Sequence, residues 1–139
     1  MINSNYKYSD ITEKIIGCAM KVHSYLGNGF PEIIYQKSLA IELEKSKLEF
    51  LQEVNYPVYY DNKIVGNRYA DFIIENKILV ELKAISEITE HNYAQVLNYL
   101  KAYKLEVGLL INFGEKSLRF KRLIISPVQS EKSGNQLNQ

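Results

Sequence analysis

Three charged side chains, those of Asp71, Glu81 and Lys83, lie within otherwise apolar stretches of the sequence. Carboxylates and an ammonium are costly to bury unless they are paired with one another or bound to a metal. A hard divalent cation such as Mg²⁺ takes one or two carboxylates together with water and phosphate oxygens. These residue types therefore suggest a site in which Asp71 and Glu81 hold a cation, while Lys83 holds a phosphate oxygen or the attacking water.

The spacing of these residues predicts that they meet on a β-hairpin. Two apolar runs flank the polar residues 75–77, which is a typical hairpin signal. A loop at these residues places Asp71 directly opposite Glu81. Because side chains alternate between the two faces of a strand, Lys83 shares a face with Glu81.

The hairpin leaves two alternatives open. The charges could lie on a solvated strand face, where Lys83 neutralises Glu81, because half-buried antiparallel strands often carry charges on one face. A loop of two or four residues would also shift the pairing by one position, and Lys77 is not the Gly or Asn that a tight turn prefers. Like charges directly opposite each other are destabilising, so the metal-site interpretation needs the cation to remove this repulsion.

The rest of the sequence predicts elements in the order α-α-β-β-β-α-β-β. Helical periodicity, glycine and proline signals and β-branched runs predict helices at 10–26, 31–45 and 89–104, and strands at 50–60, 64–74, 78–83, 106–113 and 118–126. A helical crossover between the third and fourth strands is typical of an α/β fold, with a central mixed sheet flanked by helices.

Length and composition predict one soluble domain. The chain has 139 residues, of which 46% are hydrophobic and 24% charged. We expect an N-terminal arm at 1–9, the domain at 10–126 and a disordered polar tail at 127–139. No apolar run approaches the length of a membrane span, the first residues do not resemble a secretory signal, and Cys18 is a single cysteine, so we expect a cytoplasmic protein with no membrane partner.

Charge gives little guidance on partners. The formal net charge is +1, which does not by itself indicate a nucleic-acid partner. Residues 91–122 hold six Lys or Arg residues and two acidic residues. This distribution fits either a modest basic face or an ordinary solvated surface.

Two motifs outside the hairpin complete the pattern. Glu32 and Tyr35 belong to a Gly-x-x-Glu-x-x-Tyr motif, and Gln95 precedes Tyr99 by four residues on the last predicted helix. Together with the charged hairpin and the order of elements, these motifs make residues 10–125 resemble the GxxExxY proteins, a branch of the PD-(D/E)XK nuclease superfamily.

The resemblance implies a restriction-endonuclease-like αβββαβ core and a Mg²⁺-dependent nuclease that hydrolyses phosphodiester bonds of DNA, with Mn²⁺ as a substitute cation. It makes Asp71 and Glu81 the metal ligands, with the backbone carbonyl of Leu82 as a third. Lys83 would orient or activate the water and stabilise the charge that develops on phosphorus. The residue before Asp71 is Ala70 rather than the proline of the superfamily motif.

The resemblance also gives roles to the remaining motif residues. Glu32 would approach the site from its helix as a catalytic carboxylate and further metal ligand, although the helix dipole alone explains a carboxylate at this position. Gln95 would orient the lysine or the phosphate, with Tyr99 supporting it at the substrate. Tyr35 would pack beside Glu32 or contact substrate.

Two alternatives to a nuclease remain. The same fold could serve as a non-catalytic nucleic-acid-binding module, which would show strong salt dependence and no metal requirement. The chain could also be a partner-dependent module that acts as a homodimer or with another protein.

Overall fold

A computed structural model of the protein describes residues 6–126. The elements follow one another in the predicted order, which is therefore confirmed. They are α1 (Ser9–Leu26), α2 (Glu32–Lys45), β1 (Phe50–Tyr60), β2 (Lys63–Ile74), β3 (Ile78–Lys83), α3 (Glu90–Tyr103), β4 (Val107–Asn112) and β5 (Arg119–Ile124).

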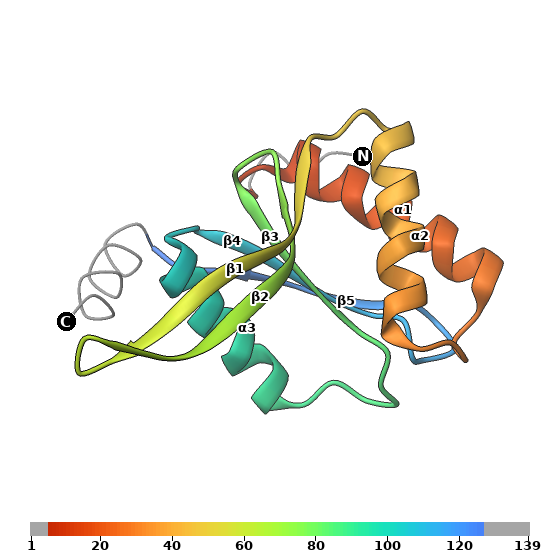
Figure 1. Cartoon of the computed structure of the whole chain (residues 1–139). Coiled ribbons are helices and arrows are strands. Elements are labelled where there is room, and N and C mark those ends of the chain that lie inside the picture. The colour runs from red at the N-terminus through yellow and green to blue at the C-terminus, as the bar shows by residue number, and fades with distance from the viewer. Residues whose placement is uncertain (1–5, 127–139) are drawn as a thin grey trace.

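The strands form one five-stranded sheet in the order β1-β2-β3-β4-β5. β3 and β4 run parallel, because α3 connects them as a crossover, and the other neighbouring strands are antiparallel. α1 and α2 cover one face of the sheet and α3 covers the other (Figure 1). The predicted α/β fold with a mixed central sheet and flanking helices is confirmed.

Two apolar clusters hold these layers together. One joins α1 and α2 to the sheet through residues such as Ile15, Leu39 and Leu82, and the other joins α3 to the opposite face. Every residue of β4 is buried, as expected for a strand that is covered on both faces. The sheet is therefore most completely covered at β3 and β4. Lys83 is the last residue of β3 and pairs with Asn112 at the end of β4.

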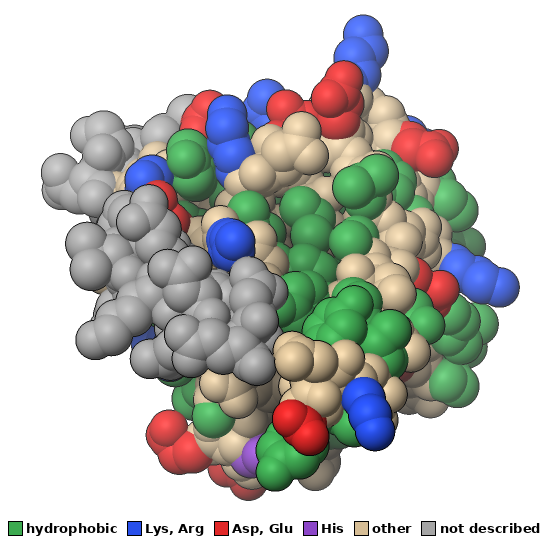
Figure 2. All heavy atoms as spheres, turned by 60° about the vertical axis from the view of Figure 1, so that its left-hand side comes forward, with side chains coloured by type: hydrophobic (Ala, Val, Ile, Leu, Met, Phe, Trp, Pro, Cys, Tyr) green, Lys and Arg blue, Asp and Glu red, His purple; other side chains and the backbone are tan. Residues whose placement is uncertain are grey.

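The outer parts of β1 and β2 form a hairpin that projects beyond the helices, and we call residues 54–69 the arm (Figure 1). β1 pairs only with β2, and the pairing of β2 with β3 is confined to residues 72–74 and 78–80. Several apolar side chains of the arm are exposed, namely Tyr59, Tyr60, Ile64, Val65 and Tyr69. Figure 2 brings the arm side of the molecule forward and shows hydrophobic side chains gathered over the middle of that face.

The predicted terminal segments lie largely outside the described residues. The tail at 127–139 and the first five residues of the expected N-terminal segment belong to this part. Of the remainder of that segment, Lys7 pairs with Glu106 at 2.6 Å and the Lys7 carbonyl accepts a hydrogen bond from Arg122. No helix within residues 6–126 is long and apolar enough to cross a membrane.

A buried asparagine fixes the chain where it leaves β3. Asn112 is 0% exposed, its amide nitrogen donates to the Ile85 carbonyl at 2.9 Å, and its amide oxygen accepts from the Ile85 N–H at 3.0 Å. The Phe113 N–H donates to the Lys83 carbonyl at 2.8 Å. A Cβ added to Gly114 would lie 2.3 Å from the Ile85 carbonyl oxygen. The segment after Lys83 is therefore locked against the end of β4 by backbone contacts that leave no room for a side chain.

We predict that Gly114→Ala lowers the free energy of unfolding by about 2 kcal/mol or more, because the added methyl must push apart two backbone segments. Chemical denaturation measures this change. Gly17→Ala is the matched control, because a methyl added at Gly17 in α1 would have no atom within 4 Å, and we expect this change to be neutral or stabilising. A Gly114→Ala protein as stable as wild type would contradict the close contact.

Candidate active site

The hairpin between β2 and β3 has the predicted register. Phe72 pairs with Val80, as a loop at 75–77 requires, and the backbone pairing stops at this pair. Asp71 and Glu81 are the next residues of their strands, so the two carboxyl groups meet where β2 and β3 begin to separate. The register predicted from the sequence is therefore confirmed, and the alternatives shifted by one residue are excluded.

Side chains replace the backbone ladder at this point. The Asp71 N–H donates to Glu81 Oε1 at 3.1 Å, and the Leu82 N–H donates to Asp71 Oδ2 at 2.8 Å. Buried backbone N–H groups must find partners when a ladder ends, and here the two carboxyl groups accept them. We call this junction, formed by Asp71, Glu81 and the backbone of Leu82, the carboxylate seam.

The β1–β2 ribbon turns over beside the seam. Ala70 packs with the α3 cluster whereas Phe72 packs with the α1–α2 cluster, although residues two apart on a regular strand share a face. Opposite Asp71, Glu53 of β1 has a left-handed backbone with φ of 51°. The Tyr103 hydroxyl lies between the strands, where it accepts from the Ala70 N–H at 3.2 Å and donates to the Val54 carbonyl at 2.5 Å. Together these contacts direct Asp71 into the seam.

A glutamine outside the set of predicted site residues also holds Asp71. Gln36 lies on α2 with 4% exposure, and its Nε2 donates to Asp71 Oδ1 at 3.1 Å. Gln36 follows Glu32 by four residues, so the two side chains share one face of the helix. The four-residue spacing from Glu32 is the sequence signal that could have indicated Gln36. It becomes informative only when α2 is known to face the seam.

The seam raises the pKa of both carboxyl groups. Burial raises the pKa of Glu81 to about 8, and the charge of Asp71 adds to this effect, while the Asp71 N–H and Lys83 act against it. Burial also raises the pKa of Asp71, opposed by the Leu82 N–H and the charge of Lys83. The metal-free pair therefore retains a proton on Glu81 at neutral pH, which marks a site that is short of positive charge.

Lys83 and Glu32 belong to the same electrostatic cluster. Lys83 is half-buried, and its charge lowers the pKa of Asp71 and Glu81. Glu32 is the first residue of α2, and partial burial raises the pKa of its carboxyl group, with repulsion from Asp71 adding to the rise and Lys83 opposing it. The fold thus brings together four of the predicted residues, Glu32, Asp71, Glu81 and Lys83.

Among the described residues, the other three predicted side chains make no hydrogen bond to Asp71 or Glu81. Gln95 is half-buried on α3 and makes no hydrogen bond to Asp71 or Glu81 among the described residues. Tyr99 is 7% exposed, and the Arg68 guanidinium lies over the Tyr99 ring, 5.4 Å from the ring centre. Any contribution of Tyr99 to a site is therefore made through Arg68, which packs on its ring.

Tyr35 lies in the first turn of α2 and is fully buried. Its hydroxyl donates to the Gly27 carbonyl at 2.6 Å and accepts from the Phe30 N–H at 3.2 Å, and its ring stacks on Phe113 at 4.6 Å between centroids. These contacts hold the start of α2, and with it Glu32, against the end of β4. The structure therefore places Tyr35 among the packing residues that position the helix.

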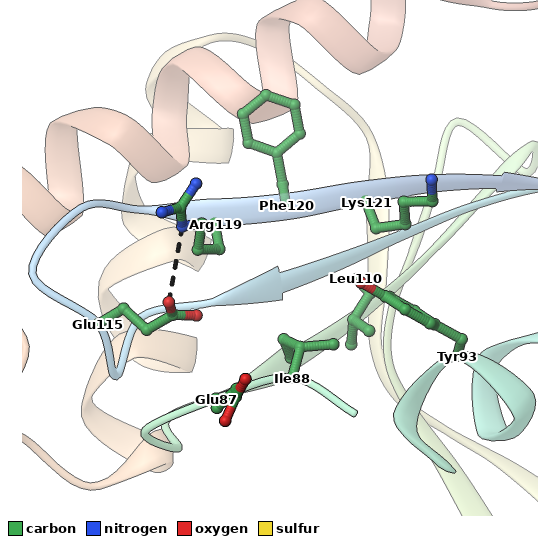
Figure 3. Close-up of a pocket in the computed structure, with 8 residues that line it drawn as sticks. All are labelled: Glu87, Ile88, Tyr93, Leu110, Glu115, Arg119, Phe120 and Lys121. Carbon is green, nitrogen blue, oxygen red and sulfur yellow. Dashed lines mark ion pairs between the residues drawn. The ribbon is translucent and has the colours of Figure 1, made fainter. Parts of the chain in front are cut away.

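A separate pocket of about 300 Å³ lies beside the end of β4 and the start of α3 (Figure 3). Its Glu115 pairs with Arg119 at 3.5 Å and accepts from the Asn112 amide at 2.9 Å. The pocket also contains Glu87 and Lys121, so its charges are mixed. None of its lining residues belongs to the carboxylate seam.

Comparisons with known proteins agree with this architecture. A family model described as the PD-(D/E)XK nuclease superfamily matches residues 9–123. A solved structure described as "Crystal structure of SSO0001" is similar with a TM-score of 0.53 and 18% sequence identity, over 94% of this chain and 66% of that chain. At that identity the likeness shows the fold alone. No curated protein gives a significant match to the chain.

We predict that Glu81→Gln stabilises the metal-free protein increasingly as the pH rises from 6 to 9. The folded-state pKa of Glu81, about 8, lies above its ordinary value of 4.5, so wild type loses stability as the pH rises from 4.5 to about 8. Glutamine keeps the hydrogen bond and never ionises, so the gain at pH 9 should be on the order of 3 kcal/mol. Thermal denaturation in EDTA measures it.

Glu44→Gln, on the exposed side of α2, is the matched control and should show no pH-dependent difference from wild type. A constant difference between Glu81→Gln and wild type at pH 6 and pH 9 would contradict a buried proton on Glu81.

Proposed function

The chain belongs to the PD-(D/E)XK nuclease superfamily, and from this premise we propose that it is a Mg²⁺-dependent nuclease that hydrolyses phosphodiester bonds of DNA. Superfamily membership suggests a nuclease, a nucleic-acid partner and the use of a divalent metal. The Gly-x-x-Glu-x-x-Tyr motif that ends at Tyr35 supports a place in the GxxExxY branch. The observation that carries the proposal is the geometry of the carboxylate seam, where the carboxyl groups of Asp71 and Glu81 meet within the electrostatic reach of the half-buried Lys83.

The donor set of the seam fits a hard divalent cation. All the available donors are oxygens, and burial together with the charge of Asp71 raises the pKa of Glu81, an effect that a bound cation would offset. No group of three His, Cys, Asp or Glu side chains gathers into a metal cluster within residues 6–126. Asp71 and Glu81 would therefore need further oxygens from the Leu82 carbonyl, water or a substrate phosphate, which is the usual coordination of Mg²⁺.

A divalent cation held there would supply a bound water of lowered pKa and screen the attacked phosphate. The protein's own groups perform the positioning. Gln36 and the Leu82 N–H fix the two oxygens of Asp71, so its orientation is set before substrate arrives. Lys83, anchored by the contacts around Asn112, would offset the charge that develops on the phosphate. Glu32 and Glu53 are further carboxylates within the electrostatic reach of this group.

Gln95 has a less direct part in this proposal. It lies on α3, the helix that covers the face of the sheet bearing Leu79, and Glu81 and Lys83 alternate onto that same face. A substrate phosphate between α3 and β3 would bring Gln95 within its reach. Its proposed role is therefore to contact bound substrate rather than to hold the carboxylates.

We predict that Lys83→Ala and Glu81→Gln each lower the rate of DNA cleavage in Mg²⁺ or Mn²⁺ by at least about 100-fold, because the first removes a cation at the reacting phosphate and the second removes a carboxylate ligand of the proposed metal. Cleavage of labelled DNA, with circular dichroism to confirm folding, measures this. Lys77→Ala, in the hairpin turn, and Glu87→Gln, in the loop after β3, are matched controls that keep the wild-type rate. Cleavage by Lys83→Ala at the wild-type rate would reject the proposed site.

A further inference from the structure

The two faces of the arm differ in chemistry. Cross-strand partners share a face, and the register pairs Tyr56 with Arg68 and Tyr60 with Lys63. Tyr56 and Tyr60 are four residues apart on β1, and the register shift between the two pairs leaves Val65 of β2 as an extra residue. Both pairs therefore lie on the same side of the ribbon, which we call the cationic face. This face therefore repeats a tyrosine beside a cation at a spacing of about 13 Å.

The opposite face of the arm has no charged side chain. It carries Asn55, Pro57 and Tyr59 from β1, whose partners on β2 are Tyr69, Asn67 and Ile64. Tyr59 and Tyr69 are 51% and 54% exposed. The separation of cations onto one face is informative, because solvation alone would favour charges on both faces of a projecting ribbon.

Contacts with α3 fix the direction of the cationic face. The Tyr56 ring lies 5.5 Å from the Tyr103 ring, and the Arg68 guanidinium lies 5.4 Å from the Tyr99 ring. Farther out on the arm, Tyr60 is 74% exposed. The base of the cationic face is thus seated on α3, whereas its outer part is open to solvent.

The cationic face leads directly to the carboxylate seam. Arg68 precedes Asp71 by three residues of the same strand, a distance of about 10 Å. Arg68 has no acidic partner among the ion pairs of the described residues, so its guanidinium is available to an external anion. Between the two cation–tyrosine pairs, Val58 is paired with Gly66, and a methyl added at Gly66 would have no atom within 4 Å, so the β2 side of this face is open at its middle.

We propose that the cationic face binds a single strand of nucleic acid and leads it to the carboxylate seam, an inference that rests on the proposed nuclease function. Proteins bind single strands by combining cations along the backbone with aromatic rings on which bases stack. The arm has both groups at a regular spacing. In a duplex the bases already stack on one another, so exposed tyrosines would gain little from it. The preferred substrate is therefore a single strand or a duplex with a single-stranded end.

Binding of labelled oligonucleotides tests this proposal without cleavage. Fluorescence anisotropy in EDTA should show that wild type binds a mixed-sequence single strand more tightly than the matching duplex. Tyr60→Ala and Arg68→Ala should each weaken single-strand binding by about tenfold, the effect of losing one stacked base or one cation contact. Lys63→Ala should also reduce the dependence of binding on salt.

Two control variants separate this face from the rest of the surface. Tyr59→Ala removes a similarly exposed tyrosine from the opposite face of the arm, and Lys14→Ala removes an exposed cation from α1 on the other side of the sheet. Both should bind single strands as wild type does. Single-stranded DNA and RNA are compared in parallel, because the same chemistry recognises both.

Each outcome decides between the two proposals. Equal binding of duplex and single strand, or binding unaffected by Tyr60→Ala and Arg68→Ala, would overturn the single-strand inference even if the protein cleaves DNA. A Tyr59→Ala variant that loses binding together with a dimeric mass in sedimentation would overturn it in favour of a second copy on the arm. Binding that depends on the arm, with no cleavage in Mg²⁺ or Mn²⁺, would support the arm and reject only the nuclease.

Discussion

The burial of two carboxyl groups where β2 and β3 separate is the constraint on which the rest of the structure depends. Ending a sheet ladder inside a protein exposes backbone N–H groups, and here Asp71 and Glu81 accept them. The same arrangement brings two acids together away from water, which raises the pKa of both. A positive charge beside these two carboxyl groups would therefore be stabilising, and Lys83 only partly offsets the effect of burial.

The surrounding elements keep this junction open and ordered. β4 lies fully buried beside β3, and Asn112 fixes the segment that follows Lys83. On the other side, the Tyr103 hydroxyl separates β1 from β2 just before Asp71. The seam is thus held by β4 on one side and by α3 on the other. The arm that extends from the seam gives the site a route along which a polymer can approach.

Much of this architecture follows from the sequence because the relevant signals are local. The apolar runs around residues 75–77 define the hairpin register, and the glycine, proline and periodicity signals define the helices. Gln36 was missed because its role depends on how α2 packs, which no local pattern encodes. The turnover of the ribbon was missed because Glu53 has a left-handed backbone that glycine would normally signal. The role of Asn112 is not evident from the sequence, because its hydrogen-bond partner Ile85 lies in the loop after β3, far from it along the chain.

Calorimetric titration of Mn²⁺ into wild type and Asp71→Asn, each with and without a short oligonucleotide, tests the central claim most directly. Asparagine preserves the size of the side chain but removes the charge that the cation requires. We predict that wild type binds Mn²⁺, with or without the help of a substrate phosphate, and that Asp71→Asn loses this binding. Equal binding by both proteins, or no binding by wild type even with the oligonucleotide present, would contradict a metal site at the carboxylate seam.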